Sequence, residues 1–532
     1  MVFKSGAPHA AGAFGLACLL ALFVICASAQ ADNTPSAAEA HFDVHEYRVL
    51  GNSKLSNRDI ERVLYPLLGD HKTLADVEVA RAALEKAYHD TGNQTVFVDI
   101  PEQDVGDAIV RLHVTEGKLH EVSIGGARYF SERKILAALP AAKAGTVPSI
   151  PELQQQLAAV NAQSADRSVV PVLKAGPTPG TVDLSIKVDD HLPLHGSIDF
   201  NNQYSPDTKP LRATVALSYD NLFQRLDSLS LQYQVSPQDW SQVSVVAANY
   251  AFGPIPDGLR PSVYYIHSNS NAATIGTIGV LGKGDIFGTR VSYPFVESAS
   301  STQSLVFGAD YKHFDNIIGL ASMPALDTPI SYSLATLGYA GSWTGGWLQE
   351  VSSVAANFGV RRAPNNADTF ANDCFKCQPN FFYLRGDETI FVKLPFGLKL
   401  QVRAAGQWAE EPLINNENYS IAGADGVRGY LEAEVLGDAA IKGTVQLYSP
   451  TWVVRGASLL NGFLYYDLAR ADIIDAVGTQ PSIARLRSAG AGGVLFPGRS
   501  VTGTFTWAYP LTDGPRTLTG QSRILFDVKG SF

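Results

Sequence analysis

The most regular pattern in this chain is an alternation of apolar and polar residues that begins near residue 194. In the segment 228–235, for example, Leu229, Leu231, Tyr233 and Val235 alternate with serine and glutamine. An alternation with a period of two predicts a β-strand with one apolar and one polar face. We predict sixteen such strands, at residues 194–203, 209–219, 226–236, 241–252, 260–269, 286–294, 302–314, 330–343, 348–361, 382–394, 398–409, 437–448, 455–468, 485–495, 500–509 and 521–531.

The connections between these segments alternate between short and long. The turns are short at 344–346, 396–397 and 497–498, and the connections are long at 270–285, 362–381, 410–436 and 469–484. An even number of strands with this alternation is typical of an antiparallel transmembrane β-barrel, polar inside and apolar towards lipid. We therefore predict an all-β, sixteen-stranded barrel over residues 193–532. A secreted soluble β-solenoid or β-sandwich is the competing interpretation.

The connection 410–436 is far longer than a hairpin needs, and long loops usually have a function. At its tip Arg428 lies between Val427 and Gly429, and Tyr430 follows. Glycine lets the backbone enter a crowded channel, and a guanidinium there requires a carboxylate partner because an unpaired buried charge is costly. Asp467, on the next strand but one, is the natural partner. We predict that these two residues lock the loop inside the lumen.

Residues 41–192 mix helical and strand patterns, and the same β-α-α-β-β order occurs twice. This order predicts two small α+β domains, at 41–117 and 118–192, each of a size that favours mutual packing. The first has strands at 47–52, 96–100 and 109–116 and helices at 57–64 and 75–90. The second has strands at 121–125, 168–173 and 182–189 and helices at 131–139 and 150–161.

Residues 1–31 have the features of a secretory signal peptide. Lys4 precedes an apolar run from about Ala13 to Ala27, and small residues suited to cleavage follow. A retained single-span anchor is the alternative, although the run is shorter than the ~20 residues a span needs.

Composition supports a membrane protein and argues against an enzyme. Apolar residues make up 45% and charged residues 17% of the chain, which has 21 Tyr and 25 Phe but only 2 Met. The sequence contains no H-E-x-x-H zinc motif, no G-x-S-x-G nucleophile motif and no phosphate-binding loop. We therefore predict no catalytic residue, no cofactor, no metal site and no nucleic-acid partner.

Two stretches resemble a known family. The tip of the long loop, Val427 to Tyr430, and the strand segment from Gly462 and Phe463 to Asp467 resemble motifs of the two-partner secretion transporters. These form the outer-membrane haemolysin secretion/activation family. In that family the loop folds into the barrel and its arginine pairs with the strand aspartate. The family tends to place glycine two residues after that aspartate, whereas Ala469 stands here, which puts close approach of the loop at that point in doubt.

The two N-terminal domains resemble the polypeptide-transport-associated (POTRA) domains of the same family. The resemblance implies an outer-membrane transporter of a Gram-negative bacterium with its POTRA domains in the periplasm. It would capture a large unfolded exoprotein, of adhesin or cytolysin type, and export it through the barrel, with activation of that partner left open. An assembly factor of the same superfamily, which usually has more POTRA domains, and a passive porin, which needs none, are the alternatives.

Three further groups of residues complete the predicted sites. We expect Cys374 and Cys377 to form a local disulfide in an external loop, because that compartment is oxidising. Phe526 and Phe532 on the last strand resemble the signal that barrels present to the barrel-assembly machinery, and outer-membrane lipid is the second expected partner. The predicted strand edge of the second POTRA-like domain, at Val169, Val170 and Val172, would bind the exported chain by strand addition. Proline at Val170 or Val172 is expected to remove the donors such an added strand needs.

The short stretch Gln30–Ala40 is too short for the barrel-plugging helix with which many members of this family begin. We therefore expect the loop 410–436 to be the main obstruction of the resting channel.

Overall fold

The computed structural model describes residues 40–532 except 256–257, 271, 276–277, 316, 319–325, 361–363, 457 and 499. These residues form two compact units. The first unit extends to Leu119 and also contains 145–150 and 176–182, and the second contains the rest. The predicted signal peptide lies outside the described residues. Within the described ranges, no helix is both long and apolar enough to cross a membrane.

The first unit is built on a three-stranded sheet covered by two helices. Strand β5 (Ile109–Glu116) lies in the centre, parallel to β2 (Glu46–Leu50) and antiparallel to β4 (Val96–Asp99). The helices α1 (Asn57–Leu64) and α2 (Leu74–Asp90) lie close to the predicted ranges. A second pair, β1 (Phe42–Val44) and β3 (Gly69–Lys72), was not predicted because these strands are short and β3 is polar.

Local chemistry explains where α2 begins and ends. Thr73 and Asp76 form a reciprocal capping box, in which each side chain accepts a hydrogen bond from the other's backbone N–H. The hydrogen bonds from Thr73 lower the pKa of the Asp76 carboxyl group. The helix ends at Asp90 with Thr91 as its C-cap, and Gly92, whose φ is +89°, follows the cap as glycine commonly does. Between these ends α2 buries Val77, Ala80, Leu84 and Tyr88 in the core of the unit.

The second predicted α+β module has the same element order. Its sheet has the order β6-β8-β7, formed by β6 (Lys118–Gly125), β7 (Arg167–Ala175) and β8 (Thr181–Asp190). The helices are α3 (Glu132–Ala137) and α4 (Ile150–Ala162). Strand β7 therefore lies at an edge of this sheet, where Pro171 costs no ladder hydrogen bond.

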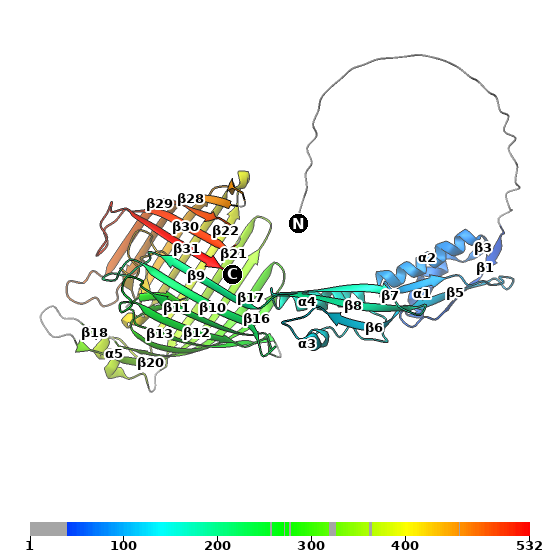
Figure 1. The fold of residues 1–532 in the computed structure, drawn as a ribbon, viewed down its shortest axis with the longest axis horizontal. Coiled ribbons are helices and arrows are strands. Elements are labelled where there is room, and N and C mark those ends of the chain that lie inside the picture. The colour runs from blue at the N-terminus through cyan, green and yellow to red at the C-terminus, as the bar shows by residue number, and fades with distance from the viewer. Residues whose placement is uncertain are drawn as a thin grey trace, which may run out of the picture. The chain divides into compact units, whose positions relative to one another are not determined.

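The remainder of the second unit is a closed antiparallel barrel of sixteen strands, which confirms the predicted fold class (Figure 1). The short segment β27 (Trp452–Arg455) continues the ladder of β26 along β28. The barrel strands are β9 (Leu194–Asn201), β10 (Arg212–Leu222), β11 (Asp227–Val235), β12 (Ser244–Ala251), β13 (Arg260–Ser268), β16 (Gly284–Glu297), β17 (Ser301–Phe314), β20 (Ile330–Thr344), β21 (Leu348–Gly359), β22 (Phe382–Lys393), β23 (Lys399–Ala409), β26 (Ala439–Tyr448), β28 (Ser458–Asp472), β29 (Ile483–Phe496), β30 (Val501–Pro510) and β31 (Arg523–Ser531).

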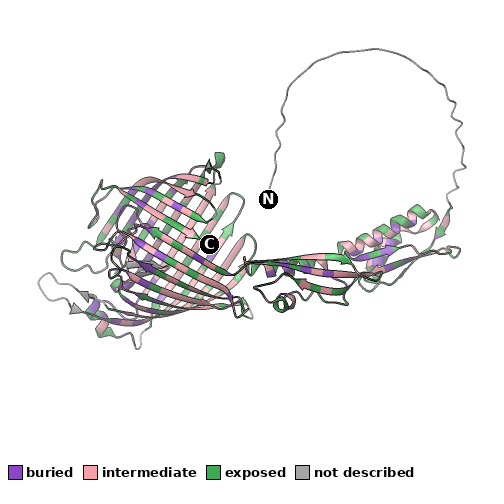
Figure 2. Cartoon of the chain, viewed as in Figure 1, coloured by how far each residue is buried: buried purple, intermediate pink, exposed green. Residues whose placement is uncertain are grey.

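The two faces of the barrel wall alternate along each strand (Figure 2). On β11, Leu229, Leu231 and Tyr233 are exposed on the outer face, as predicted, while Val235 at the end of the strand is buried. On β28, Phe463, Tyr465 and Asp467 are buried and the residues between them face outward. Phe463, Tyr465 and Asp467 therefore share the lumen face of β28.

We call the end that carries the long connections the outer end of the barrel. Several of these connections contain elements of their own: β14 (Ala272–Ile275) pairs with β15 (Ile278–Leu281), and β18 (Ile317–Ile318) pairs with β19 (Leu326–Asp327). Helix α5 (Ala367–Asp373) lies in the connection before β22. The largest apolar cluster of the barrel is built there from strand ends and connections, and it includes Phe314, Tyr332, Phe370, Phe381 and Tyr383.

Candidate functional site: a loop held inside the barrel

The long connection between β23 and β26 folds into the lumen. It begins with the turn η4 (Asn415–Glu417) and contains the short pair β24 (Tyr419–Ser420) and β25 (Leu436–Gly437). The segment between this pair, 421–435, is the loop tip. Its apolar residues Ile421, Val427 and Tyr430 are almost fully buried against Ala469 and Leu486 of the wall. The loop therefore packs on the wall at Ala469, although the family's glycine is absent there.

Arg428 and Asp467 form the predicted pair. Arg428 Nε lies 2.8 Å from Asp467 Oδ2 and Nη2 lies 2.8 Å from Oδ1, which is a two-pronged contact between guanidinium and carboxylate. The backbone N–H of Arg428 also donates to Oδ2, at 3.1 Å. Asp467 is fully buried and the Arg428 side chain is 13% exposed. The pair thus belongs to the buried class of ion pairs, in which loss of one partner leaves an uncompensated charge.

Neighbouring wall residues bind the remaining hydrogen-bonding atoms of this pair. Gln446 Oε1 accepts from Arg428 Nη1 at 2.7 Å, and the Thr444 hydroxyl donates to Asp467 Oδ1 at 2.9 Å. The guanidinium carbon lies 3.4 Å from the centre of the Tyr465 ring, a cation–π contact. The sequence pattern predicts no contact for Gln446 or Thr444, because the register between strands decides both.

A second ion-pair group holds the loop tip to β23 and β26. Asp425 Oδ1 lies 2.6 Å from Arg403 Nη1, and Asp425 Oδ2 lies 2.8 Å from Lys442 Nζ. Arg403 also binds Asp387 on β22, with Nη2 2.5 Å from Oδ2. The lumen cations Arg403 and Lys442 therefore hold the loop tip in this structure.

The far side of the loop tip is attached to the connection between β30 and β31. The Tyr430 hydroxyl donates to the carbonyl oxygen of Thr512 at 2.5 Å. The Glu434 carboxylate accepts hydrogen bonds from the backbone N–H groups of Arg516 and Thr517, at 2.8 and 2.7 Å. The loop therefore crosses the lumen and is attached on both sides.

Gly429 is required by geometry at the tip. Its φ is +101°, and a Cβ atom there would lie 3.2 Å from Pro510 Cγ and 3.3 Å from Ala508 Cβ. We expect Gly429→Ala to cost about 1–3 kcal/mol of loop attachment, because it adds backbone strain and crowds the wall. The change should raise protease cleavage within 410–436 without lowering the heat resistance of the folded barrel. Gly478→Ala, at an open loop glycine with φ +63° and no neighbour within 4 Å, is the control.

The aromatic residues of the strand motif fit against glycines on the next strand. Phe463 pairs with Gly492 and Tyr465 with Gly490, and a Cβ on either glycine would lie within 3 Å of the facing ring. Gly462 lies within β28 opposite the break between β26 and β27, where its N–H donates to Ser449 Oγ at 2.9 Å. These contacts fix the face of β28 that presents Asp467.

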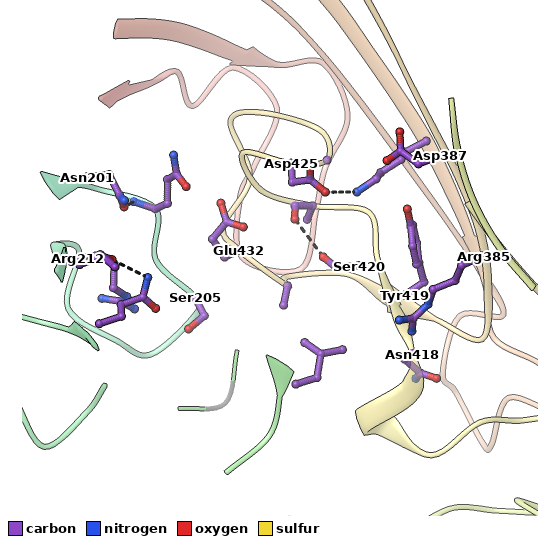
Figure 3. A pocket seen from close by; sticks show the side chains of 18 of the residues that line it. Asn201, Ser205, Arg212, Arg385, Asp387, Asn418, Tyr419, Ser420, Asp425 and Glu432 are labelled. Carbon is purple, nitrogen blue, oxygen red and sulfur yellow. Dashed lines mark hydrogen bonds and ion pairs between the residues drawn. The ribbon is translucent and has the colours of Figure 1, made fainter. Parts of the chain in front are cut away.

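Two cavities adjoin the loop. The larger, of about 650 Å³, is lined by β9 to β11, by β22 and by the loop itself (Figure 3). Asp425 and Glu432 of the loop lie between Arg212 on one side and Arg385 on the other (Figure 3). The lining has five acidic and five basic side chains: Asp199, Asp387, Glu417, Asp425 and Glu432, and Arg212, Lys312, Arg385, Lys442 and Lys529. This balance does not define a site for a small ion of either sign.

The other predicted site residues lie away from this lumen site. Cys374 and Cys377 are joined by a disulfide, with Cα atoms 5.5 Å apart, in the connection that carries α5. Phe526 on β31 lies 6.0 Å, ring centre to ring centre, from Phe200, and Phe532 is 74% exposed. Their role as an assembly signal stays a prediction.

The predicted substrate edge on β7 needs a correction. Val169 is 1% exposed, its N–H donates to Asn161 Oδ1 and its carbonyl accepts from Asn161 Nδ2. Its backbone groups are therefore not free to bind an added strand. Because N–H groups alternate in direction along a strand, those of Val170 and Val172 point towards β8, and proline there would break the sheet. The next backbone N–H group that points away from β8 belongs to Leu173, whose side chain is 41% exposed.

Comparison with known proteins places these features in a family. A family model for the ShlB-type POTRA domain matches residues 42–117, and the model for the haemolysin secretion/activation proteins ShlB/FhaC/HecB matches residues 180–450. An outer membrane transporter CdiB of Dickeya dadantii (strain 3937) is 24% identical over 182 residues, 34% of this chain. The match spans about a third (32%) of the length of that relative.

Solved structures share the fold. CdiB from Escherichia coli aligns with a TM-score of 0.59 and 17% identity, covering 95% of this chain and 93% of that one. BamA from Haemophilus ducreyi lacking POTRA domains 1–3 aligns with a TM-score of 0.58 and 11% identity, covering 92% and 100%. Fold and loop together define an outer-membrane β-barrel protein with POTRA domains in the periplasm. The chain belongs to the haemolysin secretion/activation (ShlB/FhaC/HecB) family.

Proposed function

We propose that this protein captures a large, unfolded secreted protein in the periplasm and exports it through its barrel, as in two-partner secretion. The observation that carries the proposal is the loop of the sixth outer connection, which crosses the lumen and is attached by ion pairs and hydrogen bonds. Such contacts can be exchanged for water one at a time, whereas a covalent or wholly apolar plug could not be displaced so readily.

The chemistry of the lumen suits a passing polypeptide. Its charges are mixed in sign and lie among serine, asparagine and glutamine side chains. A polypeptide offers amide groups and both charges, so it finds weak partners along such a wall without a tight site at any one point. Weak contacts are necessary, because tight capture would stall a transport driven by folding of the partner outside the cell.

Two alternative functions make different predictions. An assembly factor of the superfamily is suggested by the fold shared with BamA, and a passive porin by the barrel alone. The family model, together with two POTRA-like modules before β9, favours export. The deciding experiment is to search the neighbouring reading frames for a large secreted protein, to express the chain with it and to measure that protein in the medium. Unchanged secretion without the transporter, with loss of other barrel proteins instead, would support the assembly function.

We further propose that the exported chain adds a strand to the outward edge of β7 at Leu173. Leu173→Pro removes an outward-facing donor and leaves the pairing with β8 in place, so export should fall several-fold while outer-membrane levels are retained. Val172→Pro is the matched comparison, because it breaks the pairing with β8 and should lower the amount of folded protein. Full export by Leu173→Pro would argue against strand addition at this edge.

A further inference from the structure

Glu417 is a buried carboxylate at the base of the loop, and no predicted site includes it. It ends η4, where its N–H donates to the carbonyl oxygen of Ile414 at 2.8 Å. Its side chain is 1% exposed. A carboxylate removed from water to this degree requires partners for both oxygens.

The partners come from three strands of the wall. Lys312 Nζ on β17 lies 2.5 Å from Glu417 Oε1, and the Tyr332 hydroxyl on β20 donates to the same oxygen. The Tyr383 hydroxyl on β22 donates to Oε2 at 2.6 Å. The backbone carbonyl of Glu417 is bound as well, by Arg385 Nη2 and Gln407 Nε2, both at 3.0 Å.

An apolar layer encloses this group from the outer side. The Tyr332 ring lies 6.0 Å from Phe370 of α5 and 6.1 Å from Phe381, ring centre to ring centre. Leu413 and Ile414, which precede η4, belong to the same apolar cluster. The disulfide-bonded connection is therefore packed against the base of the loop.

We infer that Glu417 is a positioning residue that anchors the base of the loop 410–436 to β17, β20 and β22, independently of the Arg428–Asp467 pair at the tip. The two anchors use different wall strands and share no partner. The tip pair borders a separate cavity of about 320 Å³, which gives the tip room to move. When the tip pair opens together with the contacts of Asp425, Tyr430 and Glu434, the loop turns about Glu417 and remains attached to the wall.

This inference deepens the proposed function, since it concerns the loop that export would displace, but its test needs no exported partner. The full-length chain carries a reporter cysteine, Ala424→Cys, between the two anchors, and whole cells are treated with a membrane-impermeant maleimide. Cys374 and Cys377 are disulfide-bonded and do not react. Labelling is expressed per folded barrel, measured by its heat-dependent shift in gel mobility, and single-channel conductance in planar bilayers is recorded in parallel.

The variant Lys312→Met/Glu417→Gln removes both charges of the Lys312–Glu417 pair, so neither of these two side chains is left charged without the other. We expect this variant and Arg428→Ala each to raise the labelling rate about twofold to threefold, because the other anchor still holds the loop. Together they should raise it more than tenfold, beyond the product of the single effects, and produce frequent large conductance steps. Glu297→Gln, at an exposed pair with Arg260 away from the loop, is the control.

A combined variant that labels no faster than Arg428→Ala alone overturns the inference. If Lys312→Met/Glu417→Gln yields too little folded barrel, Tyr332→Phe/Tyr383→Phe replaces it, because it keeps both rings and removes two donors to Glu417. Combined with Arg428→Ala, this variant should also raise the labelling rate beyond the product of the single effects. A rate no higher than that of Arg428→Ala alone would again overturn the inference. Synergy in labelling combined with no export of any partner would retain the anchor and reject the transporter function.

Discussion

Arg428→Ala is expected to lower secretion of the exported partner at least tenfold while the amount of barrel in the outer membrane stays near normal. Breaking a buried ion pair by removing one partner costs about 3–5 kcal/mol. The lost interaction shifts the loop and does not unfold the barrel, because the wall is held by its own closed ladder of hydrogen bonds. A loop tip without its anchor samples the lumen and obstructs the chain that passes through it. Secretion assays with outer-membrane levels measured alongside test this.

Asp467→Ala should have a similar effect, and the double variant should lose less than the sum of both. Once one partner is gone the other has nothing left to hold, so the two free-energy losses are not additive. Lysine at 428 should restore export only in part, since an ammonium group cannot bind both carboxylate oxygens in one plane. Arg470→Ala is the matched control, because Arg470 lies on the same strand but faces outward and pairs with exposed Asp472. Strictly additive losses would show that Arg428 and Asp467 do not act as a pair.

Removal of the loop tip should convert the barrel into a continuously open channel. Ser420 and Leu436 are paired residues of β24 and β25, so residues 421–435 can be replaced by an Asn-Gly turn that closes the same hairpin. The deletion removes Arg428, Asp425 and Tyr430 but keeps Glu417 and Tyr419. Planar bilayers should show a steady conductance several times that of the intact chain, because the two cavities then join.

The control for this deletion is a replacement at an outer connection that does not enter the lumen. Residues 476–481, between β28 and β29, can be shortened in the same way, which keeps Ile474 and Asp475 and their contacts in place. Unchanged conductance after removal of 421–435 would mean that the loop is not the obstruction of the resting channel.

Sequence reasoning was most successful where a pattern is local. Alternation with period two located all sixteen barrel strands, and the helical pattern located α1 and α2 to within a residue. It also paired Arg428 with Asp467, because an arginine between small residues in a long loop and an aspartate on a lumen face require each other. The structure extends β28 to Asp472, beyond the predicted end at 468, because pairing with β29 continues into the outer end.

Sequence reasoning failed to find contacts between residues that only the closure of the barrel brings together. Glu417 is separated from Lys312 by 105 residues and from Tyr332 by 85, so no spacing along the chain signals their contact. The error at Val169 has a similar origin. Whether a strand edge is free depends on a side chain of the neighbouring helix, Asn161, and the alternation of the strand contains no information about it.

The attachment of the loop to so many strands also constrains the order in which the barrel folds. Glu417 requires β17, β20 and β22, Arg428 requires β26 and β28, and Tyr430 requires the connection that precedes the last strand. These contacts join residues that are distant in sequence, so the chain must lose the conformational entropy of loop closure before any of them forms. The loop can therefore reach its final position only after the last hairpin has joined the wall, and its docking marks completion of the barrel.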